Sequence, residues 1–249
     1  MIEVVGMVYR DPSFRDFLER QMYVQGWRIG GINYRTVAND PSPKLKLTDG
    51  TDIYLDPKPN DYYLNRVYRC WNYCVESSKA EYVCLVHSDM AFSEGWLKNL
   101  ERRLDGNTLP CSRMVEPGYQ RPDGRILVPG EHALEIDLGR DPARFPMDVW
   151  KSLASDLSED RVEPGGLYGC PVIHRDTFVS LGGFPEGNIT KDGRITTGED
   201  DAYVEALKGN LVSGDAYLFK KMEEAGFKHV TCFDSLVYHM QEGEMNNSE

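Results

Sequence analysis

The stretch YVCLVHSD at residues 82–89 carries the clearest indication of the fold. Its first five residues form an uninterrupted apolar run, which is typical of a strand buried on both faces of a parallel sheet. His87, Ser88 and Asp89 follow directly. Ligands of open α/β sheets bind outside the carboxyl ends of such strands. The stretch therefore predicts a buried strand with polar side chains at a ligand-binding edge.

The residues before this stretch predict the opening of a parallel α/β sheet. The β-branched run at residues 4–8 indicates a strand. Asp11 can cap a helix that has Pro12 at its first position, and apolar residues recur after them at helical spacing. We expect a second strand over residues 29–37 and a helix over residues 64–75. Strand, helix and strand in this order are typical of a parallel sheet.

The second half of the chain predicts fewer regular elements. A helix is expected to begin near Ser93. Between residues 105 and 166, Pro, Gly and charged residues are dense, so we expect loops that face a second substrate. A short strand over residues 169–173 and two strand-like pieces, at residues 229–232 and 235–239, follow. The fold class is α/β, with a mixed, mainly parallel sheet flanked by helices.

Composition narrows the classes of partner. The chain of 249 residues has a formal net charge of -12, which argues against holding nucleic acid or an anionic bilayer by bulk attraction. The beginning of the sequence has no basic leader, and no apolar stretch is long enough to span a bilayer. We expect a cytosolic protein, with a peripheral association with a membrane left open.

The cysteines form no CxxC pair, so we expect buried free thiols.

Two residues stand out as candidate metal ligands. Asp89 places a carboxylate just past the buried strand, where a divalent ion could neutralise a diphosphate. His239 ends the last strand-like piece and could supply an imidazole nitrogen to the same ion. Each residue alone also fits a simpler role, as a solvated turn aspartate and as a structural histidine.

The acidic run Glu199, Asp200 and Asp201 follows a glycine and precedes a helical pattern, so these acids would lie in the first turn of a helix. One carboxylate could act as a general base that deprotonates an attacking hydroxyl. Compensation of the helix dipole is the alternative explanation of the same acids.

A series of segments resembles glycosyltransferase family 2 in the order in which they occur. The residues concerned are Asn65-Arg66 with Trp71-Asn72, residues 81–90, residues 182–186 and residues 198–201. They look like the helix and strand that lead into the DxD-type metal motif of the family, its glycine-phenylalanine turn and its Glu-Asp base motif.

The resemblance implies a GT-A, Rossmann-like fold in a single domain over residues 1–249. Residues 1–104 would form the half that binds the nucleotide sugar, and residues 105–249 the acceptor and catalytic half. The donor would be a UDP-, GDP- or dTDP-sugar, and the acceptor a glycan or a lipid-linked glycan. The reaction would invert the configuration of the transferred sugar.

The resemblance also implies roles for single residues. Asp89 would bind Mn²⁺ or Mg²⁺, His239 resembles an additional metal ligand of some GT-A enzymes, and Asp200 would be the base, with Glu199 supporting the acceptor and Asp201 beside it. His87 replaces the first acid of the motif, which implies a role on the donor side or at the metal. The remaining donor-binding candidates are Tyr9, Arg10, Asn39, Asp40 and Ser88.

Several basic residues are candidates for contacting the diphosphate, namely Arg66, Lys191 and Arg194. Solvated surface cations are the alternative for each. We expect residues 192–197, which lie between glycines, to be mobile until the donor binds. Two other functions remain open: a sugar-phosphate nucleotidyltransferase, and a non-catalytic module that binds glycan.

Overall fold

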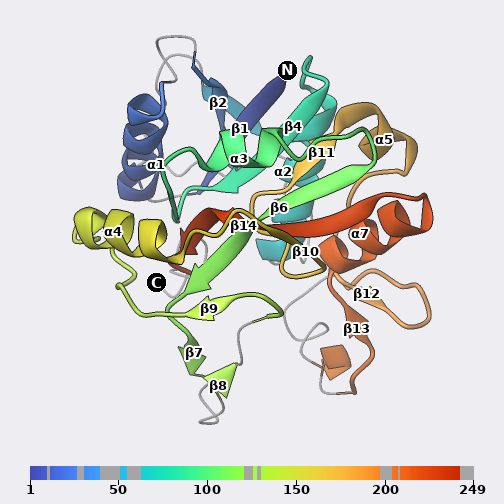
Figure 1. Cartoon of the computed structure of the whole chain (residues 1–249). Helices are drawn as coiled ribbons and strands as arrows, with labels where there is room; N and C mark the ends of the chain where they lie inside the picture. The colour runs from blue at the N-terminus through green and yellow to red at the C-terminus, as the bar shows by residue number, and fades with distance from the viewer. Residues whose placement is uncertain are drawn as a thin grey trace.

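The protein is built around two β-sheets with helices packed against their faces (Figure 1). The computed structural model describes residues 1–9, 12–26, 31–39, 51–54, 63–120, 126–127, 130–196, 204–206 and 208–241. The longer helices are α1 (Pro12–Val24), α2 (Tyr63–Glu76), α4 (Met147–Leu157) and α7 (Gly214–Glu224), and the shorter ones are α3 (Trp96–Glu101) and α5 (Arg175–Ser180). This arrangement confirms the predicted α/β fold class.

The first sheet has the strand order β11-β4-β1-β2-β3. Its strands are β1 (Ile2–Tyr9), β2 (Asn33–Asn39), β3 (Thr51–Tyr54), β4 (Tyr82–His87) and β11 (Val172–His174). All pairs are parallel except that of β11 with β4. The apolar run of β4 and the β-branched run of β1 both form strands, as the sequence predicts, and the structure shows that the two strands are neighbours inside the sheet. The predicted second strand begins at Asn33, and residues 27–30 lie outside the described residues.

Helices cover both faces of this sheet because β1 is apolar on both sides. Val4 and Val8 pack in one core with Leu18 of α1, whereas Val5 packs in another core with Val67 of α2. Alternate residues of a strand point to opposite faces, so a strand with apolar residues at consecutive positions must be covered twice. The helix α3 joins the core on the α1 side, and α5 and α7 join the core on the α2 side.

The second sheet corrects the prediction of loops over residues 105–166. Its strand order is β10-β14-β6-β9, and the short β5 also pairs with β14. The strands are β5 (Met90–Phe92), β6 (Thr108–Glu116), β9 (Leu134–Glu135), β10 (Val162–Pro164) and β14 (Lys228–His239). The strand β6 contains a proline and an arginine, which weaken its local signal, but pairing with β14 and β9 stabilises it.

The helix α4 is the second element in that stretch that the prediction missed. Its Trp150 is fully buried and packs against Tyr238 of β14, with ring centroids 5.9 Å apart. Trp150, Leu153, Ala154 and Leu157 recur at helical spacing and face one core, so the sequence carried the signal for this helix and the prediction overlooked it. The two predicted strand-like pieces near the end form one strand, β14, whose register with β6 shifts between Cys232 and Leu236.

Four short strands in the described residues form two further two-stranded sheets, β7 with β8 and β12 with β13. They are β7 (Tyr119–Gln120), β8 (Ile126–Leu127), β12 (Ile189–Thr190) and β13 (Leu211–Val212). All six cysteines are buried and free, which confirms the expectation for them. Within the described residues, no helix combines the length and the apolar character needed to cross a bilayer.

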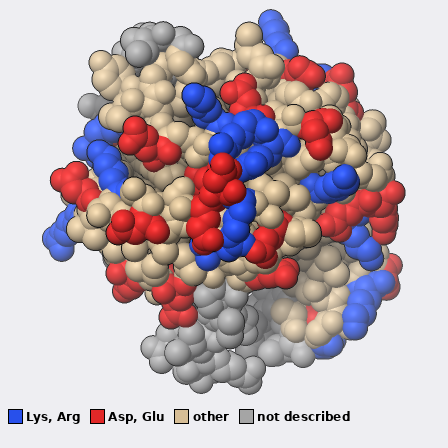
Figure 2. Space-filling model, in the orientation of Figure 1, with Lys and Arg blue, Asp and Glu red and all other residues tan. Residues whose placement is uncertain are grey.

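The surface agrees with the acidic composition. Figure 2 shows acidic and basic side chains interspersed over one face of the molecule, without a continuous basic surface. Interspersed charges of both signs, with a net charge of -12, do not favour a polyanionic partner on this face.

Candidate functional site

The ends of three strands bring two predicted metal ligands together. Asp89 lies in the turn between β4 and β5. The strand β14 runs antiparallel to β5, so that His239 pairs with Met90, and the amide of Met240 donates a hydrogen bond to the carbonyl of Asp89 at 2.9 Å. As a result, Nε2 of His239 lies 3.3 Å from Oδ2 of Asp89.

A second carboxylate binds the other nitrogen of the same imidazole. Nδ1 of His239 lies 2.9 Å from Oε1 of Glu116, at the end of β6. Glu116 is not among the residues predicted from the sequence, because a loop was expected over residues 105–166. An acid that ends the largely apolar run of residues 109–115 is the signal that could have found it, because β4 and Asp89 show a similar pattern.

The electrostatics of this cluster follow from burial and from the two acids. Only 5% of the side chain of Asp89 and 25% of that of His239 are exposed. Burial disfavours the charged imidazole, but the charge of Asp89 and hydrogen bonds to Asp89 and Glu116 outweigh burial and raise the pKa of His239 to about 10. The cluster therefore favours a positive charge between Asp89 and Glu116, which a proton on His239 or a bound cation can provide.

The two facing atoms fit a divalent ion. Two ligands that are each roughly 2.1 Å from one ion lie about 3.0 Å apart at an octahedral angle and about 3.4 Å apart at a tetrahedral angle. The measured 3.3 Å between Asp89 Oδ2 and His239 Nε2 lies within this interval. A carboxylate with an imidazole is also a suitable donor set for Mn²⁺.

These side chains do not by themselves form a complete metal cage. Among the residues that the structure describes, no group of three or more His, Cys, Asp or Glu side chains could hold a metal ion. Asp89, His239 and Glu116 form a row, because His239 uses opposite ring nitrogens for the two acids. Incomplete protein coordination is usual where substrate phosphates and water supply the remaining ligands.

His87 lies beside this row and contacts an aromatic cluster. Its ring centroid is 6.1 Å from that of His239 and 4.9 Å from that of Trp71, which it meets edge to face. Trp71 in turn packs against Phe184, with centroids 5.1 Å apart. Ser88, between His87 and Asp89, is buried. The structure therefore brings His87, Ser88, Asp89 and His239 to one edge of the sheets.

The predicted nucleoside-binding residues are only partly described. Tyr9 and Asn39 are the last residues of β1 and β2, and they are paired in register, so the backbone brings them to the same edge of the first sheet. Arg10 and Asp40 lie outside the described residues. Arg66 lies in the first half of α2, where its side chain is partly buried.

The predicted base motif, Glu199, Asp200 and Asp201, also lies outside the described residues. The chain before it is bound to α2, because Nδ2 of Asn65 donates hydrogen bonds to the carbonyls of Glu186 at 2.7 Å and Thr196 at 2.9 Å. Thr196 is the last described residue before the acids, and it is fully buried. The chain is thereby held next to α2 at Glu186 and at Thr196.

The remaining basic candidates lie in the turn that precedes Thr196. Lys191 is exposed, and the guanidinium of Arg194 lies 3.7 Å from the carboxylate of Glu205. The backbone amide of Thr190 donates to the carbonyl of Arg194 at 2.9 Å, so residues 190–194 form a hydrogen-bonded turn.

Comparison with known proteins identifies the fold. No family model and no curated protein matches the sequence. Among solved structures, GalNAc-T7 with UDP, GalNAc and Mn²⁺ superposes with a TM-score of 0.56 at 13% identity, over 96% of this chain and 43% of that chain. The mannosyltransferase PcManGT from Pyrobaculum calidifontis, in complex with GDP-Man and Mn²⁺, superposes with a TM-score of 0.53 at 13% identity, over 98% of this chain and 58% of that chain.

The likeness extends over nearly the whole chain and shows that the protein has the GT-A, Rossmann-like fold. At 13% identity it shows the fold alone. The chain spans less than two thirds of the length of either structure. Any proposal about the activity, the substrates or membership of family 2 must therefore be argued from the residues of the site.

Proposed function

We propose that this chain is a glycosyltransferase that moves a sugar from a nucleoside diphosphate donor to an acceptor hydroxyl with inversion of configuration. The observation that carries the proposal is the pair Asp89 and His239, 3.3 Å apart at the carboxyl edge of the sheets in a GT-A fold. The ordered motifs support membership of family 2, and the two solved structures of the same fold hold UDP or GDP-Man together with Mn²⁺.

The metal would be held by Oδ2 of Asp89 and Nε2 of His239. A bound Mn²⁺ or Mg²⁺ neutralises the charge that develops on a diphosphate leaving group. Asp89 contributes a buried carboxylate, and His239 contributes Nε2 while its other ring nitrogen, Nδ1, lies 2.9 Å from Oε1 of Glu116. His87, 6.1 Å from His239 by ring centroids, is close enough to the pair to contact the donor or a metal-bound water.

The donor would lie along the edge where β1, β2 and β4 end. Tyr9, Arg10, Asn39 and Asp40 are the residues that we assign to the nucleoside, with Ser88 beside the metal and Arg66 toward the diphosphate. UDP-, GDP- and dTDP-sugars are the donors to test. The acceptor would be a glycan or a lipid-linked glycan, for which residues 105–249 would provide the binding surface.

In the transfer step, Asp200 would accept the proton of the acceptor hydroxyl. The acceptor oxygen forms a bond to the anomeric carbon while the bond from that carbon to the diphosphate oxygen breaks, so the nucleoside diphosphate leaves with the electron pair. The carboxylate of Asp200 takes the hydroxyl proton. Glu199 would orient the acceptor, and Asp201 directly follows Asp200 in the sequence.

A thermal-shift and turnover panel tests this function. UDP, GDP and dTDP are each added with and without Mn²⁺ to the wild-type chain and to Asp89→Asn. One nucleotide together with Mn²⁺ should raise Tm by roughly 5–10 °C at a hundredfold excess over Kd, and more than either ligand alone. Asp89→Asn should lose the joint effect.

Other outcomes would favour the competing functions. Release of pyrophosphate from a nucleoside triphosphate and a sugar phosphate would indicate a nucleotidyltransferase. Glycan binding without transfer or hydrolysis of any nucleotide sugar would indicate a non-catalytic module. Equal joint stabilisation of the wild type and Asp89→Asn would remove Asp89 from the metal site.

A further inference from the structure

Glu116 contacts the candidate metal ligand His239 from the side opposite to Asp89. Its Oε1 lies 2.9 Å from Nδ1 of His239, and only 15% of its side chain is exposed. The two carboxylates therefore bind the two nitrogens of one imidazole. This arrangement leaves Glu116 out of contact range of an ion held by Nε2 and Asp89, since the ring lies between them.

The backbone holds Glu116 firmly in this place. It is the last residue of β6, which pairs in parallel with β14 up to Tyr238 and Val115, the residues just before His239 and Glu116. On the other side, β9 pairs with β6, and the amide of Ile136 donates to the carbonyl of Glu116 at 2.9 Å. Strand pairing on both sides fixes where its carboxylate meets the imidazole.

The chain after Glu116 is also fixed. The guanidinium of Arg140 donates hydrogen bonds to the carbonyl of Gly118 and, at 3.4 Å, to the carbonyl of Met240. Gly118 lies two residues after Glu116, and Met240 directly follows His239. Arg140 therefore joins the two chain segments that leave the site.

We propose that Glu116 is a positioning residue for the metal site, acting through His239. With an ion in place of the proton on Nε2, Glu116 would accept a hydrogen bond from Nδ1–H and so hold the imidazole with its Nε2 lone pair toward the ion at Asp89. Its negative charge also makes Nε2 a stronger ligand. Carboxylates that orient a metal-bound histidine in this way usually change metal affinity roughly 10- to 100-fold when removed. The inference rests on the proposed function, because it requires the metal site at Asp89 and His239.

The test compares two changes at Glu116 that differ in hydrogen bonding. In Glu116→Gln the amide oxygen can still accept from Nδ1–H, whereas Glu116→Leu has a similar size and no acceptor. The Kd of Mn²⁺ alone is measured for each by EPR of the free ion. We expect Glu116→Leu to weaken binding roughly 10- to 100-fold, and Glu116→Gln to recover most of that loss.

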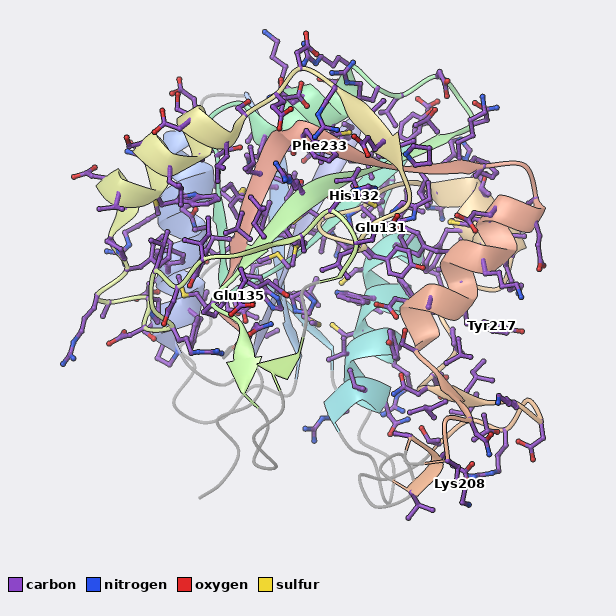
Figure 3. The ribbon with its side chains drawn as sticks, turned by 60° about the horizontal axis from the view of Figure 1, so that its bottom comes forward. Glu131, His132, Glu135, Lys208, Tyr217 and Phe233 are labelled. Carbon is purple, nitrogen blue, oxygen red and sulfur yellow. The ribbon has the colours of Figure 1, made fainter. Side chains whose placement is uncertain are left out.

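A matched control separates orientation from simple charge. Glu135, the register partner of Glu116, lies exposed at the end of β9 (Figure 3). Glu135→Gln removes the same charge from the neighbouring strand and should leave the Kd of Mn²⁺ within about threefold, since exposed charges are screened. An equal loss in Glu135→Gln and Glu116→Leu would overturn the positioning role in favour of bulk attraction.

A spectroscopic measurement reports the Mn²⁺–nitrogen bond itself. Electron spin echo modulation of bound Mn²⁺ should show a ¹⁴N coupling in the wild type and in Glu116→Gln. The coupling should vanish in His239→Gln and weaken in Glu116→Leu. If Glu116→Leu does not fold, Glu116→Ala replaces it, and ¹⁵N spectra of the wild type with Mg²⁺ should show the proton on Nδ1 of His239. A proton on Nε2 would overturn the proposal.

The outcomes distinguish the two proposals. A ¹⁴N coupling that is unchanged in Glu116→Leu overturns the role of Glu116 and leaves the proposed function intact. A coupling that behaves as expected in a protein that neither binds nucleotide nor transfers sugar overturns the proposed function alone. A wild type without the coupling overturns both.

Discussion

Asn72 and Phe184 are joined by two hydrogen bonds between one side chain and one backbone. Nδ2 of Asn72 donates to the carbonyl of Phe184 at 2.9 Å, and Oδ1 accepts from its amide at 2.8 Å. Asn65, two turns earlier on α2, binds the carbonyls of Glu186 and Thr196 in a related way. The helix α2 therefore fixes both ends of the segment that leads to the candidate base.

Replacement of Asn72 by leucine should destabilise the fold and disturb this segment. The change leaves the buried amide and carbonyl of Phe184 without their partners, which should cost roughly 2–4 kcal/mol of the free energy of unfolding. Urea unfolding measures the loss. The same change at Asn107, which is exposed, serves as the control and should cost less than about 0.5 kcal/mol. Equal losses would show that the hydrogen bonds to Phe184 contribute nothing specific.

Gln21 of α1 should support the metal site through β5. Its Nε2 donates to the carbonyl of Met90 at 2.8 Å, and its Oε1 accepts from the amide of Phe92 at 2.9 Å. Met90 follows Asp89 directly, so Gln21→Leu should both lower the free energy of unfolding by roughly 2–4 kcal/mol and weaken Mn²⁺ binding. Calorimetry with Mn²⁺ measures the second effect. A variant that is less stable but binds Mn²⁺ as the wild type does would show that β5 keeps its place without Gln21.

His229 should make the protein sensitive to acid. Its ring is buried against Tyr168 and Phe219, with centroids 4.9 and 5.4 Å away. Burial lowers its pKa to about 4, although a hydrogen bond to the backbone of Leu167 acts in the opposite direction. An unfolded histidine titrates near 6.5, so the unfolded chain binds more protons between these values. The contribution of the buried, neutral His229 to the free energy of unfolding is complete above a pH of about 6.5 and is lost as the pH falls through about 4.

The variant His229→Asn, which does not titrate in this range, tests this effect. Between pH 7 and pH 5, the wild type should lose about 2 kcal/mol more of its free energy of unfolding than the variant does. Denaturant unfolding at both pH values gives the comparison. The variant is expected to be less stable than the wild type at pH 7, so only the difference in pH dependence is informative. Parallel pH profiles would show that His229 is not the group responsible.

Asp200→Asn should separate donor binding from transfer. If Asp200 is the base, the asparagine variant should bind nucleotide with Mn²⁺ as the wild type does and should lose roughly 10²- to 10⁴-fold in turnover number. Thermal shift measures the binding, and product formation measures the transfer. Asp201→Asn is the neighbouring control, with a smaller loss expected. Transfer by Asp200→Asn at the wild-type rate would exclude Asp200 as the base.

Local sequence patterns predicted those strands and helices whose apolar residues form a regular pattern within one segment of the sequence. The apolar run of β4 indicates a strand that is buried on both faces, and the helical spacing in α2 indicates a helix that is buried on one face. The structure has both elements close to the predicted bounds. The structure also places Asp89 in the turn after β4, as predicted from the end of that run. Helix α4 was missed because Pro, Gly and charged residues are dense around it, although Trp150, Leu153 and Leu157 recur at helical spacing.

The sequence by itself determined the α/β class, the buried strand at residues 82–86 and the polar edge that follows it. Only the tertiary structure decided that His239 reaches Asp89 and that Glu116 lies behind His239. The physical reason is that the apolar pattern of a strand or helix is visible within one segment of the sequence. The pairing of β14 with β5 and β6 joins segments far apart in the sequence and depends on contacts throughout the fold. A one-residue change in either register would turn these side chains to the other face of the sheet.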